Sequence, residues 1–218
     1  MKLDVIKNYL SIQEIINNSL NKGGIVKIIS VTKTFDMNLI SPLINYGVLH
    51  YGENKVQEAL TKWLDVKKNN PKIKLHMLGK LQTNKVKKAL NLFDYIHSLD
   101  NIKLAQMLCE QEKKTSKKLK YFIQVNVTNE VGKSGVSLKE LDSFYNDCKI
   151  KYNLNIVGLM CIPPINENHN IIFQKLSDLN KKYDLSELSM GMSNDYKDAL
   201  KYGATFIRIG SAIFGKRS

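Results

Sequence analysis

The residue with the clearest chemical potential is Lys33, which directly follows a run of apolar residues. Residues 25–32 predict a strand buried on both faces, so Lys33 would lie where that strand ends. An amine in that position can attack a carbonyl carbon and form a Schiff base. The alternative is a structural lysine whose stem covers apolar surface while its amine reaches water. Position alone leaves both interpretations open.

A second candidate lies in residues 206–215, where a predicted strand carries Arg208 and ends in Gly210 and Ser211. Glycine permits close backbone approach, and the N–H groups of the following turn could bind a phosphate together with the Ser211 hydroxyl. A glycine and a serine after a strand are also typical of an ordinary turn. Taken alone, the motif therefore leaves an anion site and a plain turn as alternatives.

Two further strand ends carry polar residues. Residues 188–195 pass from a strand into Ser193, which could be the N-cap of the next helix or a second phosphate donor. Asp195 lies near the start of that helix. Glu53 and Asn54, after another strand, could begin a helix or face the same site.

Short apolar segments alternate with amphipathic helical segments along the whole chain. Helical spacing is clearest in residues 3–20, 54–66 and 101–113. The predicted strands are residues 25–32, 49–51, 75–78, 95–98, 121–127, 156–160, 187–190 and 206–209. This alternation predicts a parallel sheet, and eight strands favour a closed (β/α)8 TIM barrel with an extra N-terminal helix. An open doubly wound sheet is the alternative, but the first strand lacks its usual glycine-rich turn.

A closed barrel would bring the candidate residues together. Its last strand lies beside its first, so Lys33 would lie near Arg208 and Ser211 at the C-terminal mouth. An amine, a cation and an anion-binding turn suit a phosphorylated aldehyde bound as an imine. Pyridoxal 5′-phosphate (PLP) is such a molecule.

Composition excludes several classes of protein. The 218 residues are 43% hydrophobic and 24% charged, with 12 Gly, 4 Pro and 3 Cys, which excludes collagen-like, disulfide-rich and disordered chains. No apolar run approaches the roughly 20 residues that span a bilayer, and residues 1–20 lack the apolar core of a secretory signal. We therefore expect a cytoplasmic protein with one domain over residues 1–218.

The net charge of +13 raises the question of a polyanion partner. Arg208 and Arg217 are the only arginines among 33 lysine and arginine residues, and the lysines are scattered. Nucleic-acid readers more often use arginine with interleaved aromatic residues. We therefore expect solvated surface lysines and no nucleic-acid partner. The histidines and dispersed cysteines lack metal-ligand spacing, so no metal is expected and the histidines are assigned structural or surface roles: His50, His76, His97 and His169.

Eight ordered motifs resemble the pyridoxal phosphate homeostasis family (YggS/PROSC proteins), whose fold is similar to the N-terminal domain of alanine racemase. They are VTKT (31–34), YGENKVQE (51–58), HMLGKLQTNK (76–85), QVN (124–126), KSG (133–135), GLM (158–160), LSMGMS (188–193) and RIGSAIFG (208–215). The resemblance implies one PLP-binding barrel domain. It implies the following roles: an internal aldimine on Lys33, phosphate contacts from Ser193, Gly210 and Ser211, Arg208 near the pyridine nitrogen, and Asn54 close to the cofactor.

The resemblance also implies a role in PLP homeostasis and transfer to PLP-dependent apoenzymes. An arginine beside the ring nitrogen opposes its protonation and so weakens PLP as an electron sink. The printed chain ends at Ser218, without the further domain that supplies a second base in alanine racemase. We therefore expect a monomeric carrier with little or no turnover. A residual amino-acid racemase and a basic scaffold for a polyanion remain the alternatives.

Overall fold

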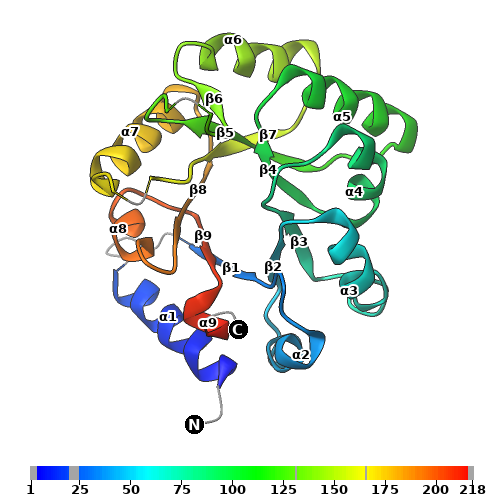
Figure 1. The fold of residues 1–218 in the computed structure, drawn as a ribbon, viewed down its shortest axis with the longest axis vertical. Coiled ribbons are helices and arrows are strands. Elements are labelled where there is room, and N and C mark those ends of the chain that lie inside the picture. Colours follow the sequence, from blue (N-terminus) through cyan, green and yellow to red (C-terminus); the bar gives the residue numbers. More distant parts are fainter. Residues whose placement is uncertain (1–3, 20–24, 131, 165, 216–218) are drawn as a thin grey trace.

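Eight parallel strands close into a barrel in the computed structural model, which describes residues 4–19, 25–130, 132–164 and 166–215 (Figure 1). Around the barrel the strands follow the order β1, β2, β3, β4, β5, β7, β8 and β9, and β9 pairs again with β1. Their bounds are β1 (Lys27–Val31), β2 (His50–Glu53), β3 (Lys74–Met77), β4 (Tyr95–Leu99), β5 (Lys120–Asn126), β7 (Ile156–Met160), β8 (Glu187–Met192) and β9 (Phe206–Ile209). The predicted TIM barrel is confirmed, and each predicted strand segment overlaps one of these strands.

A short additional strand, β6 (Val136–Ser137), pairs with the end of β5 beside the barrel. Two residues are too few to show a strand pattern in the sequence, so β6 was not predicted. The closing register between β1 and β9 runs from Lys27 opposite Phe206 to Ser30 opposite Ile209. This register places the end of β9 directly beside the end of β1.

Helices surround the barrel, as Figure 1 shows. Their bounds are α1 (Val5–Ser19), α2 (Met37–Tyr46), α3 (Val56–Asn69), α4 (Val86–Leu92), α5 (Ile102–Thr115), α6 (Leu141–Asn146), α7 (His169–Lys182), α8 (Tyr196–Lys201) and α9 (Ser211–Phe214). The N-terminal helix predicted over residues 3–20 is present as α1, although positions 3 and 20 themselves lie outside the described residues. It packs on α2, α8 and α9. The helices predicted over residues 54–66 and 101–113 are α3 and α5, each displaced by one to three residues.

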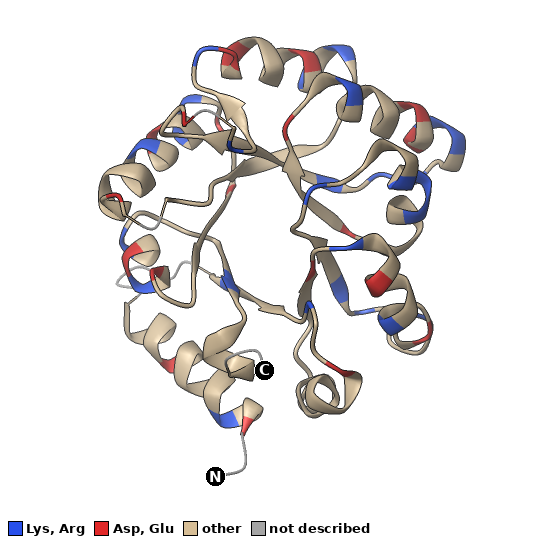
Figure 2. Cartoon of the chain, in the orientation of Figure 1, with Lys and Arg blue, Asp and Glu red and all other residues tan. Residues whose placement is uncertain are grey.

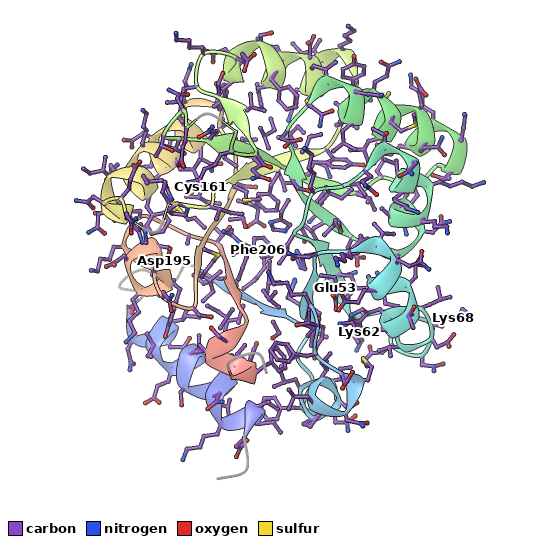
Figure 3. The ribbon with its side chains drawn as sticks, in the orientation of Figure 1. Glu53, Lys62, Lys68, Cys161, Asp195 and Phe206 are labelled. Carbon is purple, nitrogen blue, oxygen red and sulfur yellow. The ribbon has the colours of Figure 1, made fainter. Side chains whose placement is uncertain are left out.

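Two separate layers of apolar side chains form the core. A small cluster fills the barrel interior and includes Ile29, Phe122 and Phe206, whereas the larger cluster lies between the strands and the helices. Figure 3 labels Phe206 near the middle of the ring. Successive side chains of a strand point to opposite faces, so Arg208, two residues after Phe206, also points inward while Ile207 packs outward. This alternation carries a cation into the mouth of the barrel.

Charged residues lie mainly on the outer helices (Figure 2). Lysines and arginines are spread around the ring and interleaved with acidic residues rather than gathered on one helix. Within the described part of the chain, no helix has the length and apolar character that crossing a membrane requires.

Candidate functional site

A cavity of about 650 Å³ opens at the C-terminal ends of the strands. The mouth of the barrel is where side chains from several strands can converge. The cavity is lined by all six residues to which the resemblance assigns a role toward the cofactor: Lys33, Asn54, Ser193, Arg208, Gly210 and Ser211. Apolar walls come from residues that include Val31, Leu78 and Met160. The cavity thus combines an amine, a guanidinium and hydroxyl groups with apolar walls, and His169, Asn194 and Asp195 add further polar side chains to its lining.

The loop that carries Lys33 is held by two side chains of α3. The Lys62 ammonium donates to the backbone carbonyl of Thr32 at 2.7 Å, and the Thr34 N–H donates to Glu58 Oε1 at 2.6 Å. Thr34 has a φ of 68°, a left-handed conformation that costs a non-glycine residue free energy. These bonds stabilise the turn on both sides of Lys33 and so fix where its side chain starts.

Glu53 lies beneath this loop and is fully buried. Its Oε1 accepts hydrogen bonds from Thr32 Oγ1 at 2.7 Å and Trp63 Nε1 at 3.0 Å, and pairs with Lys62 Nζ at 2.8 Å. Figure 3 shows Glu53 and Lys62 next to each other between β2 and α3. Both sequence interpretations of Glu53 are wrong, because α3 begins only at Val56 and the carboxylate points into the layer between strand and helix.

Ser193 joins two segments at the mouth of the barrel. Its Oγ accepts hydrogen bonds from the backbone N–H groups of Gly210 and Ala212, each at 3.3 Å. The N-cap interpretation of Ser193 is wrong, because Asp195 occupies the N-cap position of α8 and accepts a bond from the Met192 N–H at 2.5 Å. Two backbone donors and one hydroxyl therefore converge at the cavity wall. The Ala212 N–H belongs to the turn after Gly210 that the sequence analysis singled out as a source of donors.

Arg208 is nearly fully buried and is held by two hydrogen bonds. Its Nη1 donates to Ser189 Oγ and its Nη2 to the Cys161 carbonyl, both at 2.8 Å. Burial lowers the pKa of Arg208, and the nearby Asp195 carboxylate acts in the opposite direction. Because a guanidinium starts from so high a pKa, it stays charged at neutral pH. Arg208 is therefore a fixed cation with an immobilised orientation.

Three histidines that the sequence analysis assigned structural or surface roles form a chain behind Arg208. His97 Nδ1 lies 2.9 Å from Ser189 Oγ, His97 Nε2 lies 2.9 Å from His76 Nδ1, and His76 Nε2 lies 2.9 Å from His50 Nδ1. Burial lowers the pKa of His50 to about 4, with Lys27 adding to the effect. Burial likewise puts the pKa of His76 and His97 well below its usual range. All three rings are therefore neutral at pH 7.

The only sequence signal for this chain is that each histidine falls within a predicted strand. Nothing in their spacing shows that the three point inward and meet. Within the described ranges, no group of three or more His, Cys, Asp or Glu residues could hold a metal ion.

His169 is a further titratable residue at the cavity. Its Nδ1 lies 3.4 Å from Asp195 Oδ2, and its Nε2 lies 2.9 Å from the carbonyl oxygen of Pro164. Because a carbonyl oxygen only accepts, the Nε2 must carry the proton of that bond. The Asp195 contact becomes an ion pair only when Nδ1 also carries a proton.

Comparison with known proteins agrees with the geometry. Residues 7–218 match the family described as the N-terminal domain of alanine racemase. The chain is 37% identical over 200 residues to the pyridoxal phosphate homeostasis protein of Aquifex aeolicus, covering 88% of this chain and 87% of that protein.

Solved structures give the same relationship. PipY of Synechococcus elongatus, solved with PLP bound, superposes with a TM-score of 0.87 at 30% identity over 97% of this chain and 100% of that one. Alanine racemase of Clostridium difficile shares the fold with a TM-score of 0.73 at 13% identity. That match covers 94% of this chain and 55% of the racemase.

Proposed function

We propose, because this chain belongs to the alanine racemase N-terminal domain family and within it to the pyridoxal phosphate homeostasis proteins, that it binds PLP at the barrel mouth and maintains its intracellular supply. The observation that carries the proposal is the convergence of Lys33, Arg208 and Ser193 on one cavity. The 37% identical relative is named for PLP homeostasis, and PipY has been solved with PLP bound.

The donor set of the cavity fits PLP. A phosphate needs several hydrogen-bond donors around one point, and the N–H groups of Gly210 and Ala212 already converge on the Ser193 hydroxyl. An aldehyde needs an amine, which Lys33 brings to the same cavity. An aromatic ring needs apolar walls, which the lining residues supply. Each part of the molecule therefore has a matching group in the described structure.

PLP supplies an aldehyde carbon that forms a Schiff base with a lysine amine, and a phosphate that anchors it. In our proposal Lys33 provides that amine. Ser193, Gly210 and Ser211 would bind the phosphate end, with Asn54 alongside. Arg208 would face the ring nitrogen, where its fixed charge would raise the free energy of adding a second positive charge. The site would then hold PLP without promoting carbanion chemistry.

The same geometry favours holding over turnover. Racemisation needs two bases placed on opposite sides of the reacting carbon. Among the described lining residues the cavity has no tyrosine or cysteine, and the Nε2 of His169 is occupied by its hydrogen bond to the Pro164 carbonyl. We therefore propose a carrier that passes PLP to apoenzymes in the cytoplasm, with little or no catalysis.

The test is the visible spectrum of the protein after incubation with PLP. We expect an absorption band that borohydride fixes as a covalent adduct, mapped to Lys33 by peptide mass. Lys33→Ala should lose both the band and the adduct, whereas the control Lys68→Ala, on the exposed side of α3, should keep them. A wild-type protein that stays colourless would overturn the PLP assignment. Interconversion of D- and L-alanine that depends on Lys33 would overturn the carrier role in favour of a racemase.

A further inference from the structure

A continuous line of hydrogen-bonded side chains crosses the interior of the barrel from its mouth to its opposite end. It starts at Arg208 on β9, passes through Ser189 on β8, His97 on β4 and His76 on β3, and ends at His50 at the start of β2. The four contacts measure between 2.8 and 2.9 Å. Except for His50, which is partly buried, every member is buried. The line therefore runs through the buried interior of the barrel.

Aromatic neighbours fix the planes of the two central rings. His76 stacks on Tyr95 with 4.4 Å between ring centroids and 13° between planes. His97 stacks on Phe122 at 4.2 Å and 19°. Phe206 meets the edge of the pair, at 85° to His97. Stacking occupies the faces of the imidazoles and leaves their ring nitrogens directed along the line.

Hydrogen-bonding capacity then sets one direction for the whole line. Arg208 can only donate, so Ser189 Oγ accepts from it and has one proton left to give. The contact of that hydroxyl with His97 Nδ1 is its only other hydrogen bond among the described residues. His97 must then donate through Nε2 to His76, and His76 through Nε2 to His50. The opposite direction would leave the buried Ser189 proton without an acceptor among the described groups.

We propose that Ser189, His97 and His76 are positioning residues for Arg208, acting as a one-directional relay of neutral, Nε2-protonated histidines anchored at His50. The proposal rests on the proposed function, since Arg208, which the relay would hold in place, belongs to the proposed PLP site. Through Ser189, the relay fixes one arm of the guanidinium, and the Cys161 carbonyl fixes the other at 2.8 Å. Losing the Ser189 bond would free Arg208 to turn away from the cofactor.

The surrounding charges are consistent with neutral rings. Cations face the line at both ends, with Arg208 beyond Ser189 and Lys27 beside His50. The other charged groups near His50 and His76 are Asp94, Lys74, Glu187 and Lys67. Lys27 is itself paired with Glu187 at 2.8 Å. A proton added to either central ring would remove the acceptor that the line needs there.

The first test needs no PLP and no variant. Long-range 1H–15N NMR of the apoprotein labelled in histidine distinguishes the two neutral tautomers and the cation. At pH 7 we expect the Nε2–H tautomer for His50, His76 and His97. An Nδ1–H tautomer or a cation at His97 would overturn the relay. This result is independent of whether PLP binds.

The second test links the relay to the cofactor site. Ser189→Ala should raise the dissociation constant for PLP about tenfold, the factor expected for misplacing one charged contact. Ser30→Ala is the matched control, since Ser30 is equally buried in β1 and its hydroxyl has no partner among the described residues. The dissociation constant of this control should stay within about twofold of wild type.

Equal dissociation constants for the Ser189→Ala and Ser30→Ala variants would overturn the positioning role. If Ser189→Ala does not fold, His97→Met provides the same comparison by removing the next link with little change in volume. Failure of the wild-type protein to bind PLP at all would instead overturn the proposed function, and the NMR result would then decide whether the relay exists.

Discussion

Acidification from pH 7 to pH 5 should destabilise this protein strongly, because three histidines must stay neutral in the folded state. Burial lowers the pKa of His50 to about 4 from its ordinary 6.5, and it holds the pKa values of His76 and His97 well below that ordinary value. As the pH falls, the three histidines of the unfolded chain therefore bind protons before those of the folded protein do. The contribution of the neutral histidines to stability is complete above pH 6.5. It is lost progressively as the pH falls from there through the folded pKa values.

The magnitude follows from the shifts. A histidine with an unfolded pKa of 6.5 that stays neutral when folded loses about 2 kcal/mol of stability between pH 7 and pH 5. His76 and His97 are fully buried and contribute that amount each, whereas the partly exposed His50 contributes about 1–2 kcal/mol. The total is roughly 5 kcal/mol, which corresponds to a fall in Tm of about 10–20 °C for a chain of this length.

Urea unfolding at a series of pH values measures this directly. Trp63 is the only tryptophan and is fully buried, so its fluorescence reports unfolding. Near pH 5.5 the free energy of unfolding should fall with the slope expected when the unfolded chain binds close to three more protons than the folded protein. His97→Gln should reduce the slope by about one proton. A free energy that stays constant between pH 7 and pH 5 would refute the reasoning, since the rings would then carry protons in the folded state.

Two further predictions concern packing around the site. Glu53→Ala removes the buried partner of Lys62 and should cost about 3–5 kcal/mol of stability. The control Asp65→Ala breaks an exposed pair with Lys68 at 3.4 Å and should cost less than about 1 kcal/mol. Equal falls in melting temperature would contradict the buried ion pair of Glu53 with Lys62. Gly158→Ala places a Cβ 1.9 Å from the Glu187 carbonyl oxygen, so β7 and β8 must separate and stability should fall by at least about 3 kcal/mol. An unchanged midpoint of urea unfolding would show that the two strands move apart at little cost.

Local patterns in the sequence were sufficient to predict the eight barrel strands and their order along the chain, but not the two-residue strand β6. Apolar runs alternating with helical periodicity reflect constraints that act within a few residues, and these constraints predict parallel strands and their approximate ends. A strand end also predicts where a side chain emerges, which is why Lys33, Arg208 and Ser211 were singled out. The structure places all three at one cavity.

The partners of these side chains depend on contacts between distant strands. Glu53 lies under α3 because Trp63 and Lys62 supply its hydrogen bonds there, and a strand pattern cannot show on which face such partners will arrive. Ser193 accepts from Gly210 and Ala212 rather than capping α8, because the parallel pairing of β8 with β9 brings the ends of these two strands together.

The sequence by itself determined the alternation of strands and helices and the residue types at the strand ends, since both follow from local side-chain periodicity. Only the tertiary structure decided that His50, His76 and His97 meet in the barrel interior. These residues are more than 20 positions apart, and their distances depend on strand register and barrel closure. Register arises from the packing of whole strands against each other, so no short stretch of sequence contains it.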